Sequence, residues 1–286
     1  MIRTIEGLSA LAERYKVLLC DVWGVVHNGR ESFPAAARAL TQWREVAGPV
    51  ILISNAARPS REVAIQLISL GVPPSAWSAL VTSGDVTRAL LAEKAPGPAY
   101  LIGTDRHMPL YDGLGLSFGG LEEAAFISCT GPVNDEVDTP EDYRAVLGRA
   151  AERRLPMICA NPDRVVQRGD RLVYCAGALA ELYVTLGGST LMAGKPHPPI
   201  YEACLARAAE LTGAPARKAE VLCVGDGIPT DIAGANAQGL DALFVAGGIH
   251  GAEVSGPDGR LDPVAAETLL AAAGAHADYA MSALVW

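Results

Sequence analysis

Short runs of consecutive apolar residues alternate with longer amphipathic stretches along most of the chain. The apolar runs are rich in Val, Ile and Leu, and the stretches between them place apolar residues at helical spacing. Continuously apolar strands separated by helices are typical of parallel sheets that helices cover on both faces. The pattern therefore predicts an α/β fold.

The predicted strands are short and are mostly followed by turn residues such as Gly, Ser, Asn or Asp. They cover residues 17–22, 50–54, 80–84, 99–103, 124–129, 155–160, 190–194, 221–226 and 242–248. The predicted helices cover residues 1–15, 34–46, 59–70, 85–94, 177–188, 198–211, 230–238 and 263–273, with one more beginning at the capping sequence 139–142.

Composition narrows the class of protein. With 286 residues and 50% hydrophobic content, the chain can bury a large core in one or two domains. A net charge of −9 argues against binding to nucleic acid or to a membrane surface, and no apolar run approaches the roughly 18 residues of a membrane span. The amino-terminal segment carries Glu6 and Glu13 and is unlike a signal peptide. Six cysteines without a CxxC pair are typical of reduced core residues, so we expect a soluble cytoplasmic protein.

Polar residues with catalytic potential follow the apolar runs of four predicted strands. Asp21 follows the run 17–20, Ser54 and Asn55 follow 50–53, Lys195 follows 190–194, and Asp226 comes shortly after 221–224. Ligands of open parallel sheets bind beyond the carboxyl ends of the strands. A carboxylate nucleophile, a hydroxyl and amide pair, a fixed cation and a second carboxylate suit phosphoryl transfer, with Mg²⁺ between the two carboxylates.

Each of these residues also has an ordinary structural interpretation. An aspartate at a strand end is commonly a turn residue, and Ser-Asn before a helix is an N-cap signal. Lys195 in a Gly-Lys-Pro turn is by itself a surface lysine, and GDGIPTDI is by itself a turn in which Thr230 caps a helix. All four together, at the ends of predicted core strands, favour one joint site.

Four segments resemble, in order and spacing, the motifs of the haloacid dehalogenase (HAD) superfamily. They are DVWGVVHNG, ILISNAARPS, AGKPHPPIYEACL and VGDGIPTDIAGANAQG. They are most similar to subclass IIA, which includes phosphatases of sugar phosphates, nucleotides, p-nitrophenyl phosphate and pyridoxal phosphate. The segments LVTSG, AYLIG, CANPD and CAGALAELY resemble the same branch, so the likeness covers nearly the whole chain.

The resemblance implies a fold and an activity. The fold would be a Rossmann-like, doubly wound parallel core of residues 1–83 and 189–286, into which an α/β cap domain of residues 84–188 is inserted. The activity would be Mg²⁺-dependent hydrolysis of a small phosphorylated metabolite. The net charge and the lengths of the apolar runs favour no nucleic-acid and no membrane partner. A homodimer remains open.

The resemblance also implies roles for individual residues around the phosphoryl group. Asp21 would be the nucleophile, forming an aspartyl-phosphate, and would bind the metal ion. Ser54 and Asn55 would hold the transferring phosphoryl group. Lys195 would neutralise that group and orient Asp21.

Further roles concern the metal ion and the leaving group. Asp226 would complete the metal site, and Asp231 would support it. Asn161 and Asp163, in the turn Asn-Pro-Asp of the cap, would face the leaving group of the substrate. The alternative for this pair is a local Asx-turn.

Trp23 departs from the family pattern. The usual phosphatase motif is D-x-D, in which the second aspartate protonates the leaving oxygen and later activates water. Loss of such a general acid and base costs roughly 10²–10⁴-fold in rate. The metal site need not be lost, because in the family the residue at this position binds Mg²⁺ through its backbone carbonyl, which Trp23 also has.

Three interpretations of Trp23 follow. The first, which we favour because the metal-binding and phosphoryl-binding residues are kept, is a phosphatase whose leaving group needs little protonation or whose acid is another residue. His27 titrates near neutrality and is one such residue, although a solvated loop histidine is the alternative. The second is a dehalogenase-like hydrolase, which has an aromatic residue here and needs no metal. The third is a catalytically weak phosphate-binding or regulatory module.

Overall fold

The computed structural model describes residues 2–168, 171–256 and 260–286, and the chain forms two compact units. The larger unit consists of Met1–Ser54, Ala64–Val81 and Tyr201–Trp286, and the smaller unit consists of Asn55–Val63 and Thr82–Ile200. Each unit has its own parallel sheet. The predicted fold class is confirmed: the protein has an α/β fold with a parallel core sheet and a separate parallel α/β insert.

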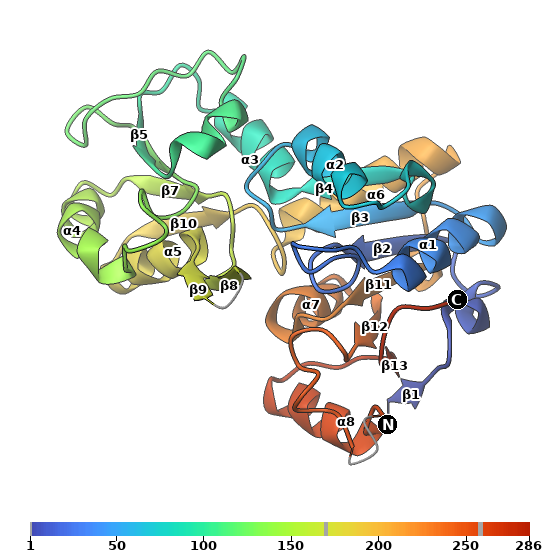
Figure 1. Ribbon diagram of the computed structural model, residues 1–286. Coiled ribbons are helices and arrows are strands. Elements are labelled where there is room, and N and C mark those ends of the chain that lie inside the picture. The colour runs from blue at the N-terminus through green and yellow to red at the C-terminus, as the bar shows by residue number, and fades with distance from the viewer. Residues whose placement is uncertain (1, 169–170, 257–259) are drawn as a thin grey trace. The chain divides into compact units, whose positions relative to one another are not determined.

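The core sheet has seven strands in the order β1-β13-β12-β11-β2-β3-β4 (Figure 1). Their bounds are β1 Arg3–Thr4, β2 Val17–Asp21, β3 Val50–Ser54, β4 Ala79–Thr82, β11 Val221–Gly225, β12 Asp241–Val245 and β13 Tyr279–Met281. Every residue of β2, β3 and β11 is buried, as the apolar runs that make up most of each strand predict. Strand order therefore places the ends of β2, β3 and β11 next to one another.

The sheet of the smaller unit has four strands in the order β10-β7-β6-β5, all parallel. Their bounds are β5 Ala99–Ile102, β6 Phe126–Cys129, β7 Pro156–Cys159 and β10 Ser189–Met192. A separate antiparallel pair, β8 (Val165–Arg168) and β9 (Arg171–Tyr174), accompanies it. The core of this unit is built on Ile127, Met157 and Tyr183, which are fully buried.

Helices follow the strands as the alternating pattern predicts. Their bounds are α1 Pro34–Val46, α2 Ser60–Ser69, α3 Ser83–Ala92, α4 Arg144–Glu152, α5 Ala176–Thr185, α6 Pro198–Thr212, α7 Ala233–Gln238 and α8 Pro263–Ala272. Local signals fix several helix starts. Pro34 and Pro263 occupy the first turns of their helices, and Thr82 and Asp85 form a capping box at α3.

The amino-terminal prediction was wrong. In place of a helix over residues 1–15, the chain forms β1 and a short 3₁₀ helix, η1 (Leu8–Leu11). The backbone N–H groups of Arg3 and Ile5 donate to the carbonyls of Asp278 and Ala280 along β13. Pairing with a distant strand therefore overrides the amphipathic pattern of this segment.

The strand of residues 190–194 was expected in the core sheet, but β10 pairs with β7 in the smaller sheet. Its sequence, Ser-Thr-Leu-Met, is less apolar than those of β2, β3 and β11, and none of its residues is buried. The cap boundaries at residues 84 and 188 stay a prediction. The hairpin of β8 and β9 and the final strand β13 were not predicted.

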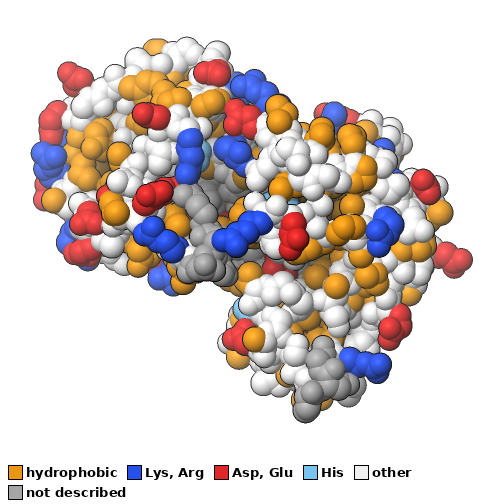
Figure 2. All heavy atoms as spheres, viewed as in Figure 1, with side chains coloured by type: hydrophobic (Ala, Val, Ile, Leu, Met, Phe, Trp, Pro, Cys, Tyr) orange, Lys and Arg blue, Asp and Glu red, His pale blue; other side chains and the backbone are white. Residues whose placement is uncertain are grey.

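The helices, the surface charges and the cysteines can be compared with what the composition predicts. In the part of the chain that the structure describes, no helix is long and apolar enough to cross a membrane. On the face shown in Figure 2, Lys and Arg side chains are interspersed with Asp and Glu. The six cysteines are all buried as thiols.

Candidate active site

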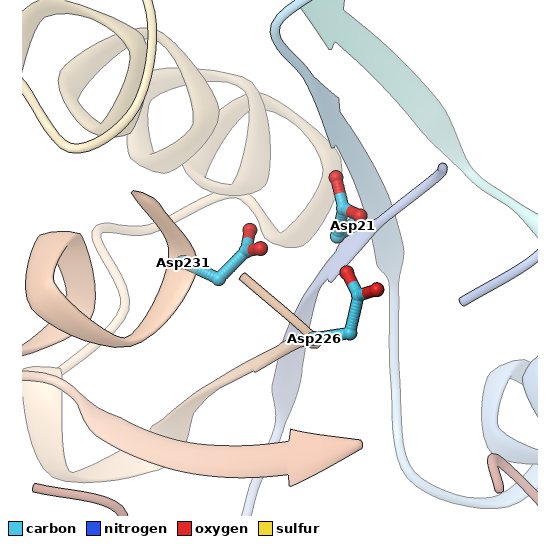
Figure 3. A group of neighbouring side chains, drawn as sticks. All are labelled: Asp21, Asp226 and Asp231. Carbon is cyan, nitrogen blue, oxygen red and sulfur yellow. The ribbon is translucent and has the colours of Figure 1, made fainter. Parts of the chain in front are cut away.

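Three aspartates converge at the carboxyl end of the core sheet (Figure 3). Asp21 is the last residue of β2, Asp226 directly follows β11, and Asp231 lies in a single π-helical turn, η6 (Ile228–Ile232). Each offers a carboxylate oxygen, and these oxygens lie within 4.8 Å of one another. All three residues are buried, with exposed fractions of 4–5%. The structure therefore brings together the three carboxylates that the sequence assigned to a metal site.

Glycines make room for this acidic cluster. A Cβ atom at Gly24 or at Gly248 would lie 2.1 or 2.0 Å from Oδ2 of Asp226, and one at Gly225 would lie 2.2 Å from Cγ of Asp231. Real Cβ atoms do not approach other atoms so closely, so these positions require glycine. Gly24 also has a φ of +83°, which favours glycine independently. The loops after β2 and β12 therefore lie directly against Asp226.

Hydrogen bonds fix the orientation of two of these carboxylates. Oδ2 of Asp226 accepts from the N–H of Ile249 at 3.0 Å, and Oδ2 of Asp231 accepts from the N–H of Gly227 at 3.0 Å. The hydroxyl of Tyr201 donates to the backbone carbonyl of Asp231 at 3.4 Å. Burial raises the pKa of Tyr201 well above its ordinary value, so that hydroxyl stays protonated as a donor.

The acidic cluster fits a divalent metal ion. Three like charges so close together and so well buried repel one another, and a divalent cation would offset that repulsion. Carboxylate oxygens are also the ligands that Mg²⁺ prefers. Asp21, Asp226 and Asp231 would hold the ion.

Trp23 lies two residues after Asp21 and is 37% exposed. Its ring packs edge-to-face against that of His27, with the ring centroids 5.2 Å apart. His27 is not the solvated loop histidine of one interpretation, because only 3% of it is exposed. Its Nδ1 accepts from the N–H of Gly29 at 2.8 Å, so the neutral ring carries its proton on Nε2.

Ser54 ends β3, beside the end of β2, and is buried. The next residue, Asn55, uses its side chain within the smaller unit. Its Oδ1 accepts from the N–H of Lys195 at 2.7 Å, and its Nδ2 donates to the carbonyl of Lys195 at 3.1 Å and to Oδ1 of Asp163 at 2.8 Å. We call this arrangement the Asn55 clamp. It joins three segments of the smaller unit that are far apart in the sequence.

The turn Asn161-Pro162-Asp163 contains the Asx-turn that was the alternative to a role in substrate binding. Oδ1 of Asn161 accepts from the N–H of Asp163 at 2.9 Å. The carboxylate of Asp163 in turn is a partner of the Asn55 clamp. Gly177 packs against the turn, since a Cβ there would lie 2.0 Å from the carbonyl oxygen of Pro162. The turn is therefore fixed on both sides.

The Asn55 clamp gives a prediction about stability. Asn55→Ala is expected to lower the free energy of unfolding by roughly 1–3 kcal/mol, because it deprives buried backbone groups of Lys195 of their partner. Asn55→Asp should cost more at neutral pH, because a second carboxylate would then face Asp163. Denaturant unfolding followed by circular dichroism measures both.

The matched test is the double variant Asn55→Asp with Asp163→Asn. It exchanges the donor and the acceptor, so it should recover part of the stability that Asn55→Asp loses. If the double variant is no more stable than the sum of the two single losses predicts, the bond between these side chains contributes nothing measurable.

Sequence reasoning missed the residues that support the site. The bonds of the Asn55 clamp join positions 108 and 140 residues apart, so no local pattern indicates them. Gly24 and Gly248 carried a weak signal, because each lies within a few residues after a core strand, where close backbone approach is common. Tyr201 carried none.

Models of known families match two parts of the chain. The model described as haloacid dehalogenase-like hydrolase matches residues 18–117. A second model, described as HAD-hydrolase-like, matches residues 192–272. The first range includes Asp21 and Ser54, and the second includes Lys195, Asp226 and Asp231.

Individual proteins resemble the chain over most of its length. A solved hydrolase of the haloacid dehalogenase-like family from Brucella suis 1330 is 46% identical, with a TM-score of 0.86, over 98% of this chain and 100% of that one. The 5'-nucleotidase YutF of Bacillus subtilis (strain 168) is 29% identical over 82% of this chain and 88% of its own length. The D-glycerol 3-phosphate phosphatase of Mycobacterium tuberculosis (strain ATCC 25618 / H37Rv) is 28% identical over 86% of this chain and 67% of its own length.

Proposed function

Since the chain belongs to the haloacid dehalogenase-like family, and to its subclass IIA type with an inserted cap, we propose that it is a metal-dependent phosphatase of small phosphorylated metabolites. The observation that carries the proposal is the buried cluster of Asp21, Asp226 and Asp231. The phosphatase and nucleotidase activities named for two relatives support the same reaction class.

The proposed reaction has two steps, both at Asp21. A carboxylate oxygen of Asp21 attacks phosphorus, the bond from phosphorus to the ester oxygen breaks, and the leaving group departs with the electron pair. Water then attacks the phosphorus of the aspartyl-phosphate. The bond between phosphorus and Asp21 breaks, the carboxylate is restored, and the water oxygen and its hydrogens leave in dihydrogen phosphate.

Other residues would hold the groups that react. Mg²⁺, when bound, would neutralise charge that develops on the phosphoryl oxygens. Ser54 would donate to the phosphoryl group, and the cation of Lys195 would offset its charge. We assign to the Asn55 side chain the positioning of Lys195 rather than a phosphoryl contact, because its oxygen and nitrogen both bind Lys195 and its nitrogen also binds Asp163.

A metal-dependence assay tests the proposal. A panel of phosphate esters, acetyl phosphate and 2-haloacids is incubated with the protein in Mg²⁺ or in excess EDTA. Phosphate release is expected with Mg²⁺, falling to background with EDTA and returning when Mg²⁺ is added back, because the acidic cluster would repel the phosphoryl group without a cation.

The other outcomes point to the other two interpretations of Trp23. Halide release that EDTA does not affect would favour the dehalogenase-like hydrolase. Binding of inorganic phosphate without turnover of any compound would favour the binding module. Phosphate release undiminished by exhaustive chelation would contradict the metal-dependent reaction itself.

A further inference from the structure

Trp23, which takes the place of the general acid in the proposed reaction, carries an aromatic side chain two residues after the nucleophile. Trp23 follows Asp21 by two residues, and its neighbour Gly24 lies against the carboxylate of Asp226. The backbone of Trp23 is therefore bonded to a residue, Gly24, that contacts the acidic cluster. The side chain is 37% exposed, although the backbone next to it contacts a buried carboxylate.

The loop that follows Trp23 fixes the position of the indole. A Cβ at Gly29 would lie 2.3 Å from Cη2 of Trp23, so the benzene edge of the indole rests on the backbone of this glycine. The buried ring of His27 contacts the indole edge-to-face, and Gly29 holds that ring in turn through the bond to its Nδ1. The N–H of Gly24 also donates to the carbonyl of His27 at 2.8 Å, which closes the loop.

A fixed, partly exposed indole is a stacking surface. In the D-x-D motif of the family, position 23 holds the aspartate that protonates the leaving group. Trp23 therefore favours a leaving group that can stack on an aromatic ring and that can depart without a proton. A planar ring bonded directly to the ester oxygen meets both requirements. It can stack on the indole, and its oxygen departs as a stable aryloxide that needs no protonation.

We propose that Trp23 selects substrates whose leaving group is an aryl or heteroaryl ring attached through the ester oxygen. This inference rests on the proposed phosphatase function and specifies its substrate class. In the first step, the bond between phosphorus and the aryl oxygen breaks, and the oxygen keeps the electron pair as aryloxide. Solvent protonates the aryloxide after it leaves.

Binding of phosphonates tests the stacking surface without turnover. Phenylphosphonate, cyclohexylphosphonate and methylphosphonate carry the same head group, and their carbon–phosphorus bond resists hydrolysis. With Mg²⁺ present, the wild type should bind the phenyl compound more tightly than the cyclohexyl one by roughly two- to twelve-fold, the range of an aromatic pair. Isothermal calorimetry measures the three affinities.

Variants assign the preference to Trp23. Trp23→Leu should bind the phenyl and cyclohexyl compounds equally, and Trp23→Phe should keep part of the preference, the ratio of the two affinities being the measured quantity. Gly29→Ala should also reduce the preference, because its Cβ would displace the indole. Trp77→Leu, at another partly buried tryptophan of the larger unit, is the matched control and should keep the wild-type ratio.

Two results would overturn the inference. One is a wild type that does not prefer the phenyl compound over the cyclohexyl one, and the other is a preference that survives in Trp23→Leu. Hydrolysis of acetyl phosphate, which has no ring, separates failure of this inference from failure of the proposed function. If the protein hydrolyses acetyl phosphate but the phosphonates show no preference for the phenyl compound, only the inference fails. If the protein hydrolyses no phosphate compound, the phosphatase function itself is contradicted.

Discussion

Asp21→Asn is expected to reduce phosphate release from every substrate by at least about 10⁴-fold, the scale on which loss of a covalent nucleophile acts. The amide of asparagine is a much weaker nucleophile than a carboxylate, so the acyl-phosphate would not form. The change also removes one negative charge from the acidic cluster, which should weaken metal binding. Phosphate release from acetyl phosphate and phenyl phosphate, with Mg²⁺, measures the loss.

The control is the same substitution at an exposed aspartate of the smaller unit, Asp112→Asn, which should leave the rate unchanged. Beryllium fluoride, an analogue of the phosphoryl group, should bind the wild type and not Asp21→Asn. A variant with clearly measurable turnover and an unchanged circular dichroism spectrum would mean that the reaction does not pass through a covalent bond to Asp21.

Trp23→Asp is expected to raise the hydrolysis of alkyl phosphates, by at most the roughly 10²–10⁴-fold that a general acid and base contributes. In the wild type, the rate should rise steeply as the pKa of the leaving group falls, and the variant should flatten this dependence. The gain will be smaller if the loop moves into the space that the indole vacates over Gly29 and His27. A series of alkyl and aryl phosphates of graded leaving-group pKa measures both slopes.

Aryl phosphates provide the internal control, because their leaving groups gain little from an acid. Their hydrolysis should not rise in Trp23→Asp, and should fall where stacking on the indole contributes. If the rate of the wild type does not depend on the leaving-group pKa, the inference that this protein lacks a general acid is contradicted. His27→Gln would then be the next variant, since the buried ring of His27 lies in contact with Trp23.

The fold was largely predictable because its strands carry their own signal. A strand that is buried on both faces reads as a nearly continuous apolar run, as β2, β3 and β11 do before their last residues, and the helices between them show their own periodicity. Sheet membership carries no such local signal. β10 (Ser189–Met192) has no buried residue, and only its pairing with β7 places it in the smaller sheet.

The acidic cluster was predictable for a related reason. Parallel strands bring their carboxyl ends to one edge, so Asp21 and Asp226 had to lie near each other once β2 and β11 were neighbours. The Asn55 side chain was assigned to the phosphoryl group on motif alone. Its bonds to Lys195 and Asp163 depend on how distant segments of the smaller unit meet, which no stretch of sequence encodes locally.

The position of β2 between β3 and β11 has a consequence for synthesis on the ribosome. β3 begins at residue 50 and soon covers one edge of β2 (Val17–Asp21), but the strand that covers the other edge begins only at residue 221. At roughly 5–20 residues per second, the edge that bears the nucleophile would wait on the order of 10–40 s for its partner. During that time an apolar strand with unpaired backbone groups is open to pairing with other chains. The nascent chain should therefore need chaperone protection most while the intervening unit is being made.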